Sequence, residues 1–225
     1  MIRAGETTAC VCGGADVLTW TKRAGHSALG TMSPTALRAF DVRHDGTLLG
    51  EGAGFLVLEA FQEDAVRKPL AWVRGVGSAN DATGMTAADV SGLSAKYAVE
   101  RSLRDAGLPA TAIGLINAHG SGTPMNDLTE KRALGAVFAQ PPKPLVFATK
   151  GNFGHTLGAT GALETIALIL AMRSRRVPPI AGLEQPDPEF TLPLAQTAMT
   201  HSARYGLNLT LGFGGFDTSL VLEAA

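Results

Sequence analysis

The sequence has little cysteine and no surplus of charge of either sign. Its two cysteines, Cys10 and Cys12, are too few for a disulfide-stabilised scaffold. The start, MIRAGETT, is not a signal peptide, so we expect a reducing, cytoplasmic compartment. A formal net charge of -1 and a pI of about 6.5 argue against a nucleic-acid-binding or polybasic membrane surface.

A long apolar run is also lacking. The longest apolar helix candidate, Ala162–Met172, is too short to cross a bilayer and contains Glu164, so we expect no membrane segment. Glycine is abundant instead, with 27 residues in 225, and hydrophobic residues make up 45%. This composition predicts one sizeable core of the α/β class with tight turns.

Strand-like and helix-like segments alternate along the chain. Apolar runs predict strands at Thr7–Cys12, Gly54–Glu59, Ala71–Gly77, Ile113–Ala118, Leu145–Thr149, Leu207–Leu211 and Ser219–Glu223. Helical spacing predicts helices at Leu93–Ala106, Asp127–Phe138 and Gly158–Arg175. The last helix is apolar on nearly every face, which predicts burial between layers. The alternation, ending in two strands around the turn GFGGFD, predicts a layered α/β fold with a mixed β-sheet.

The stretch ETTACVCGGAD raises the question of whether Cys10 is a nucleophile. A reactive cysteine needs a helix N-terminus or a nearby cation that lowers its pKa. Here a glycine pair follows, and the stretch contains no basic residue. We therefore interpret Cys10 and Cys12 as small buried residues of a strand. No second Cys/His pair follows at zinc spacing, so we expect no metal site.

Two histidines stand in glycine-rich loops that directly follow predicted strands. His119 follows IGLINA within NAHGSGTPMND, and His155 follows LVFAT and Lys150 within TKGNFGHTLGATG. Loops at strand ends commonly carry catalytic groups in α/β proteins. A neutral imidazole can donate an N–H to a developing oxyanion or accept a proton near neutral pH. Lys150 is expected to keep His155 neutral, and the two loops together favour a functional role.

Other polar residues of the glycine-rich segments have mainly structural interpretations. Glu51, between glycines, is expected to be a buried ion-pair partner, and Asp127 an N-cap with Glu130 at capping-box spacing. Ser121 and Thr123 either bind a substrate amide or fix their own loop. The segment GFGGF lacks the Gly-Lys-Ser/Thr of a nucleotide P-loop, so nucleotide phosphate binding is excluded.

Taken together, these segments resemble the β-ketoacyl synthases, the condensing enzymes of fatty-acid and polyketide synthesis, with the thiolase-like fold. The resemblance runs from Ile2 to the C-terminus and includes, in family order, FDVRHDGTLLGEGAGFLVLE, SLRDAGLPATAIGLINAHGSGTPMNDLTE, TKGNFGHTLGATGALE and VPPIAGLEQPDPEF. It implies the end of the N-terminal ketosynthase half over residues 1–69 and a complete C-terminal half over residues 70–225. A complete member is roughly twice as long.

The resemblance also bears on Cys10. In the family, the nucleophile lies in a Thr-Ala-Cys-Ser-type motif at the start of a buried helix. A later Ile-Arg-x-Gly-Glu stretch precedes a strand that ends in Gly-Gly-Ala-Asp, and IRAGETTACVCGGAD matches this second landmark. The nucleophile is therefore expected to be absent from this chain. The family segment that precedes this landmark would then be absent too. The apolar surface that it normally packs against would be exposed unless something else covers it.

The resemblance implies roles for the polar residues. In the family, a cysteine takes an acyl chain from an acyl carrier protein, and two histidines stabilise the charge that develops as a malonyl thioester loses carbon dioxide. The matching residues here are His119 and His155. Lys150 matches the lysine that supports the second histidine, and Asp127 and Glu130 match acidic residues of its network.

Four residues match substrate-binding positions of the family. Ser121 and Thr123 match hydroxyl positions that contact the phosphopantetheine arm, and Phe213, followed by Gly214, matches the phenylalanine that gates the acyl pocket. The usual Phe-Gly-Phe-Gly-Gly-Thr-Asn motif differs here at Leu211, Phe216 and Asp217.

Three interpretations stay open. The chain is the decarboxylating half of a split synthase, a non-catalytic partner similar to a chain-length factor, or an inactive fragment. The retained histidines favour the first, and the missing cysteine the second. The implied partners are acyl carrier protein and a second chain, in a homodimer or a heterodimer with a ketosynthase subunit or N-terminal half. Substrates would be carried on phosphopantetheine, with no metal or nucleotide cofactor. Condensation by this chain alone is not expected, because it requires a nucleophile.

Overall fold

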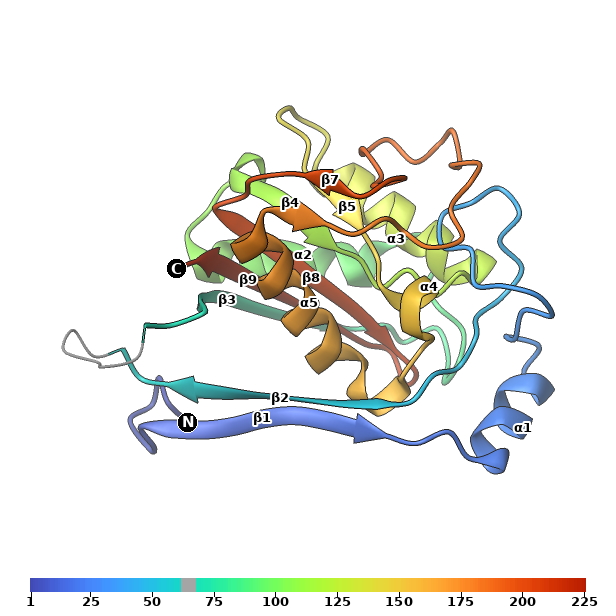
Figure 1. Cartoon of the computed structure of the whole chain (residues 1–225), viewed down its shortest axis with the longest axis horizontal. Coiled ribbons are helices and arrows are strands. Elements are labelled where there is room, and N and C mark those ends of the chain that lie inside the picture. The colour runs from blue at the N-terminus through green and yellow to red at the C-terminus, as the bar shows by residue number, and fades with distance from the viewer. Residues whose placement is uncertain (62–67) are drawn as a thin grey trace.

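The computed structural model describes residues 1–61 and 68–225, and Figure 1 shows its layers. An antiparallel pair of long strands, β1 (Ala9–Asp16) and β2 (Gly52–Glu59), forms one layer, with Val11 opposite Val57. Strands were predicted in both places. The prediction that both cysteines are buried is wrong, because Cys10 is half-buried and Cys12 exposed. In the described part of the chain, β1 pairs with β2 and with no other strand.

A five-stranded mixed sheet forms the second sheet layer, in the order β3-β9-β8-β4-β5. Its strands are β3 (Ala71–Asn80), β4 (Ile113–Asn117), β5 (Leu145–Phe147), β8 (Tyr205–Gly212) and β9 (Phe216–Ala224). β4 runs parallel to β5 and β8, whereas β9 is antiparallel to both β3 and β8. The predicted mixed sheet and terminal hairpin are confirmed. A short pair, β6 (Arg176–Val177) and β7 (Met199–Thr200), lies apart from this sheet.

Helices cover the five-stranded sheet on both sides. α2 (Leu93–Ala106) has its predicted bounds, ends at Gly107 with φ of 67°, and packs on β3 and β9. α3 (Pro124–Val137) lies beside it, and α5 (Thr160–Ser174) covers the opposite face. Two short helices, α1 (Trp20–Ala28) and α4 (Lys150–Phe153), were not predicted from the sequence.

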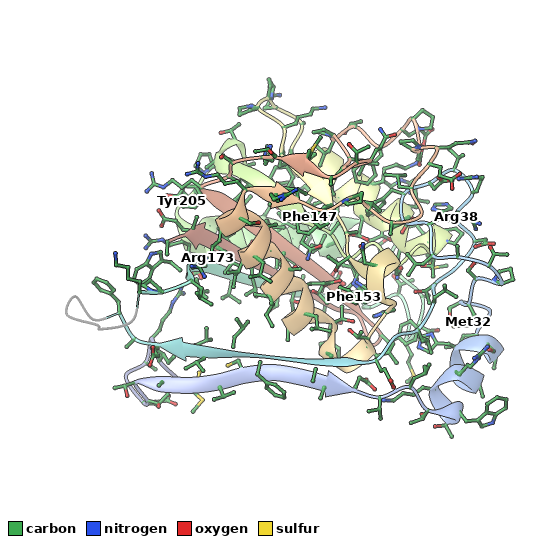
Figure 2. All side chains as sticks on the ribbon, viewed as in Figure 1. Met32, Arg38, Phe147, Phe153, Arg173 and Tyr205 are labelled. Carbon is green, nitrogen blue, oxygen red and sulfur yellow. The ribbon has the colours of Figure 1, made fainter. Side chains whose placement is uncertain are left out.

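α5 lies between the two sheets. It contacts β2 and β1 on one side and β8 and β4 on the other, and side chains fill the space between these layers (Figure 2). With the preceding 3-10 turn, the segment Leu157–Ser174 has 18 residues and a mean hydropathy of 1.2, enough by length and composition to cross a membrane. The sequence prediction concerned only Ala162–Met172, the apolar centre of this longer segment. Its packing between two sheets accounts for its apolar composition in this fold.

The contact between β3 and α2 depends on glycine. A Cβ added at Gly77 would lie 2.0 Å from the Ala98 carbonyl oxygen and 2.4 Å from the Ser102 nitrogen. We predict that Gly77→Ala lowers the free energy of unfolding by about 1–3 kcal/mol, because helix and strand must separate. Urea denaturation measures this, with Ser78→Ala, on the exposed face of β3, as the control. Equal stability of the two variants would contradict the prediction.

Candidate active site

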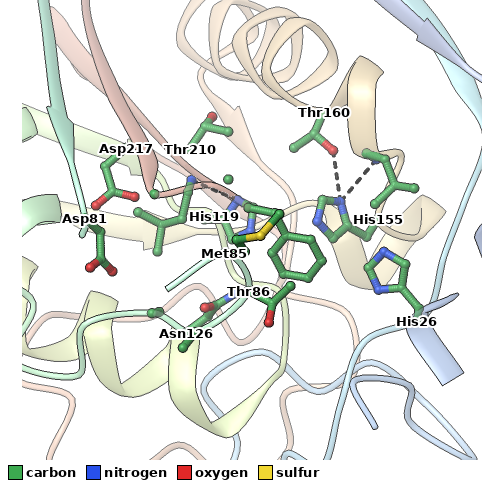
Figure 3. Close-up of a pocket in the computed structure, with 17 residues that line it drawn as sticks. His26, Asp81, Met85, Thr86, His119, Asn126, His155, Thr160, Thr210 and Asp217 are labelled. Atoms are coloured by element: carbon green, nitrogen blue, oxygen red, sulfur yellow. Dashed lines mark hydrogen bonds between the residues drawn. The ribbon is translucent and has the colours of Figure 1, made fainter. Parts of the chain in front are cut away.

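A cavity of about 360 Å³ opens where β4, the segment after β5, and the β8–β9 turn meet (Figure 3). Its wall includes His26, Asp81, Met85, His119, His155 and Phe213. β4 and β5 are adjacent and parallel, so the segments that follow them emerge at the same edge of the sheet. The structure thus brings together the two histidines that sequence reasoning selected. Their ring centroids lie 5.3 Å apart, with the planes at 85°.

The protein fixes the tautomer of His119. The Leu211 backbone N–H donates to its Nδ1 at 3.3 Å, and Lys150 Nζ lies 3.1 Å from the same atom. Both neighbours are donors, so Nδ1 accepts and the ring proton is on Nε2. The Nε2–H is therefore the donor available to a bound group.

His155 is held in the same way by different neighbours. The Leu157 backbone N–H donates to His155 Nδ1 at 3.3 Å, and Thr160 Oγ1 lies 3.0 Å from this nitrogen. The ring proton is again on Nε2. Two imidazoles with the same tautomer thus line one cavity.

Both imidazoles are neutral at physiological pH. Burial lowers the pKa of His119 well below 6.5, and the charge of Lys150 and the neighbouring His155 lower it further. Burial, Lys150 and His26 lower the pKa of His155 in the same direction. A pair of neutral N–H donors is suited to an oxygen atom that becomes negative during a reaction.

Lys150 is buried behind the histidines. Its Nζ donates to the Glu164 carboxylate, to the His119 carbonyl oxygen and to His119 Nδ1, so all three N–H groups have acceptors. Lys150 therefore hydrogen-bonds to His119 and acts on His155 only through its charge. The family resemblance had implied instead that Lys150 supports His155. Sequence reasoning did not include Glu164 in the site. The sequence feature that could have identified Glu164 is that it is a single carboxylate in a helix that is otherwise apolar on nearly every face.

The two acidic residues of α3 fix the loop around His119. Glu130 accepts the backbone N–H groups of His119 and Gly120, each at 2.7 Å, and burial raises its pKa to about 8. Asp127 accepts the backbone N–H of Phe40 at 2.7 Å and is fully inside the protein. The prediction that Asp127 is an N-cap is wrong. α3 begins three residues earlier, because a proline is well suited to the first helical position.

The two loop hydroxyls bond to each other rather than line the cavity. Ser121 Oγ lies 3.2 Å from Thr123 Oγ1 and accepts a hydrogen bond from Asn126 Nδ2 at 2.9 Å. Of these three residues, Asn126 is on the cavity wall. The geometry gives both hydroxyls a structural task, and their contact with a substrate stays a prediction.

Glu51 is not a buried ion-pair partner, so that prediction is wrong. It is exposed, and its carboxylate accepts the Leu18 backbone N–H at 3.1 Å. Odd-numbered residues here, including Ala53 and Phe55, face away from α5, and Glu51 shares their side. The alternation of side chains along a strand accounts for the exposure.

Phe213 stands at the cavity wall on the β8–β9 turn. Its ring stacks on His26, with centroids 5.5 Å apart and planes at 18°. Gly214 has φ of 83°, which favours glycine, and its N–H donates to the Met85 carbonyl oxygen at 2.7 Å. His26 was not selected from the sequence, since it lies on α1, a nine-residue helix that was not predicted. A gating role for Phe213 and Gly214 stays a prediction.

The described residues that line the cavity include neither cysteine. Cys10 Sγ lies 3.6 Å from Cys12 Sγ on β1, and hydrogen bonding with the Cys12 thiol raises the pKa of Cys10. A raised pKa is the opposite of activation. The geometry thus agrees with the interpretation of Cys10 as a strand residue. Within residues 1–61 and 68–225, no cluster of three or more His, Cys, Asp or Glu side chains is placed to hold a metal ion.

Two family models match the chain. "Beta-ketoacyl synthase, N-terminal domain" matches residues 1–64, and "Beta-ketoacyl synthase, C-terminal domain" matches residues 70–184. Among curated relatives, 3-oxoacyl-(acyl-carrier-protein) synthase 2 of Vibrio cholerae is 36% identical, with 99% of this chain and 57% of the relative covered.

Solved structures show the same likeness. The ishigamide ketosynthase/chain length factor has 35% sequence identity and a TM-score of 0.93, covering 100% of this chain and 56% of that one. A type II polyketide synthase ketosynthase, bound to its acyl-carrier protein and a hexaketide, has 27% identity and a TM-score of 0.95, covering 100% and 58%. The chain thus spans just over half the length of these relatives. The predicted thiolase-like α/β fold is confirmed.

Proposed function

Because the chain belongs to the β-ketoacyl synthase family, we propose that it forms the decarboxylating part of a condensing-enzyme active site. The supporting observation is that His119 and His155 are both neutral and line the same cavity. In each ring Nδ1 accepts a backbone N–H, so the ring proton is on Nε2. The substrate is a malonyl thioester carried on the phosphopantetheine of an acyl carrier protein, in fatty-acid or polyketide synthesis. An acyl-carrier protein bound to the ketosynthase of one similar structure supports this choice of partner.

The chemistry follows from the two donors. The thioester carbonyl oxygen lies against the Nε2–H groups of His119 and His155. When the carbon–carbon bond to the malonyl carboxylate breaks, carbon dioxide leaves and the electron pair forms an enolate on that oxygen. Preorganised N–H donors in a buried site stabilise such a charge strongly. Lys150 and Glu130 hold His119 and its loop in place.

Condensation needs an acyl group on a nucleophile next to this enolate. Neither cysteine of this chain is placed for that role. We propose that the nucleophile comes from the part of the family's N-terminal domain that residues 1–64 do not cover, on another polypeptide or another segment. Val11, Phe55 and Val57 on the outer face of β1–β2 are 61–69% exposed, which is the surface such a segment would cover. The complete assembly is then a cytoplasmic homodimer or heterodimer, in which residues 1–69 form the end of the N-terminal ketosynthase half and residues 70–225 the C-terminal half.

A second candidate function is that of a non-catalytic partner subunit. A solved structure with ketosynthase and chain length factor components supports it, as does the position of the cysteines away from the cavity. The two functions differ in one measurable property, since only the first requires decarboxylation.

We predict that the purified chain releases carbon dioxide from malonyl-loaded acyl carrier protein. Release is expected to rise when a polypeptide carrying the remaining N-terminal domain is added, because that segment covers the exposed face of β1–β2. Trapping of labelled carbon dioxide measures the rate. Folded protein that releases none, alone or with the added polypeptide, would contradict the enzymatic proposal and favour the partner subunit.

A further inference from the structure

The two cysteines of β1 form a pair of thiols outside the cavity that holds the histidines. Cys10 Sγ lies 3.6 Å from Cys12 Sγ, and neither residue lines that cavity. Residues two apart on a strand point to the same side, so both thiols lie on one face of β1, opposite Leu58 and Leu56 of β2. Val11, between them, points to the other face. Cys10 is half-buried and Cys12 exposed, so a small ion can reach the pair.

The strand holds the two thiols at a fixed spacing. All eight residues of β1 pair in register with β2, from Ala9 opposite Glu59 to Asp16 opposite Gly52. A flexible loop would lose conformational entropy when it brings two thiols onto one ligand, whereas a paired strand is already ordered. The pair is therefore preorganised for a ligand that binds both sulfur atoms.

The same spacing disfavours a disulfide between the two residues. Side chains two residues apart on an extended strand start about 6.5 Å from each other. A disulfide needs Cβ atoms only about 3.5–4.5 Å apart. Closing the S–S bond would therefore bend β1 away from its hydrogen-bonded register with β2. We expect the pair to remain two free thiols.

A metal ion bound by both sulfur atoms needs a wider spacing than a disulfide. With metal–sulfur bonds of about 2.3 Å, two thiolates lie about 3.8 Å apart around a tetrahedral ion and about 4.6 Å apart around a linear one. The Sγ atoms are 3.6 Å apart in the structure. Small rotations of the two side chains reach either geometry, and the backbone keeps its place.

The number of donors selects the ion. In the part of the chain that the structure describes, no third His, Cys, Asp or Glu joins the two thiols in a metal-binding group. Structural Zn²⁺ sites use four protein ligands, so the pair alone does not complete one. Thiolates also select Cu⁺, a soft ion that accepts as few as two sulfur ligands. A pair of thiols without further donors fits Cu⁺ better than Zn²⁺.

We propose that Cys10 and Cys12 together bind one Cu⁺ ion on β1. The step is a ligand exchange without a change in oxidation state. Two S–H bonds break, two Cu–S bonds form, and the two protons pass to the solvent. Neither histidine of the cavity takes part, so this site is independent of the proposed decarboxylation.

A copper titration of the reduced, full chain under anaerobic conditions tests the proposal. The chain competes for Cu⁺ with bathocuproine disulfonate, whose absorbance reports the copper that it retains. The wild-type chain is expected to bind one Cu⁺ with high affinity. Cys10→Ser and Cys12→Ser are each expected to bind about a hundredfold more weakly, because the second thiolate acts at a high effective concentration. Val11→Ser, on the opposite and exposed face, is the control and keeps the wild-type affinity.

A further variant keeps two thiols but separates them. In Val11→Cys/Cys12→Val the thiols are on adjacent residues, whose side chains point to opposite faces of the strand. This variant is expected to bind Cu⁺ as weakly as the single serine variants, although its number of thiols is unchanged. Urea denaturation checks that each variant is folded.

The result that supports the proposal is high-affinity binding that needs both cysteines on the same face. Folded wild-type chain that leaves all the copper with the chelator would overturn it. Wild-type affinity in either serine variant, or in the variant with separated thiols, would also overturn it, because a single thiol would then account for the binding.

Discussion

Replacing His119 by alanine is expected to slow carbon dioxide release from malonyl-loaded acyl carrier protein by about a hundredfold to a thousandfold. The change removes one of the two Nε2–H donors that we propose stabilise the enolate. The loss should appear mainly in kcat, because the charge that the donor stabilises exists only in the transition state and the enolate. Trapping labelled carbon dioxide under saturating substrate measures it.

The control is His201→Ala. His201 lies outside the cavity wall, where its Nε2 is hydrogen-bonded to the Gly114 carbonyl oxygen at 2.8 Å. His119→Gln keeps an N–H donor on the side chain and is expected to recover part of the rate. Because His119→Ala also leaves Lys150 one acceptor short, its folding is checked by denaturation. A rate within threefold of wild type, in folded protein, would contradict the role of His119.

Lys150→Met is expected to lower the free energy of unfolding by about 3–5 kcal/mol. The substitution leaves the Glu164 carboxylate without its cation, although both side chains are 1% exposed. It also removes donors from the His119 carbonyl oxygen and Nδ1. Urea denaturation at neutral pH measures the loss. Decarboxylation is expected to fall as well, because the His119 ring is then less firmly held.

The matched control is Lys96→Met, which breaks a pair with Glu100 at 3.0 Å on the surface of α2. Exposed pairs of this spacing contribute about 0.3–0.5 kcal/mol, so its loss should be small. The double variant Lys150→Met/Glu164→Leu should recover much of the stability, since it leaves no unpaired buried charge. A loss below about 1 kcal/mol in Lys150→Met would mean that Glu164 is held by other donors.

Elements whose side chains repeat with a clear period were predictable from the sequence. α2 has its predicted bounds, because apolar residues recur at helical spacing and Gly107 follows as a C-cap. The two histidines were found for a similar reason, since each follows an apolar strand and stands beside glycine. α1 was not predicted; it has only nine residues and buries none of them.

Contacts between polar groups that are distant in the sequence could be identified only from the three-dimensional packing. The carboxylate of Glu164 reaches Lys150 from the next helix, and Asp127 accepts the N–H of Phe40, which is 87 residues away. The same holds for Glu51, whose exposure depends on which face of β2 packs on α5. Local periodicity records which face of an element is apolar, whereas a buried polar contact depends on how distant elements pack. That packing places Lys150 between the Glu164 carboxylate and the His119 imidazole.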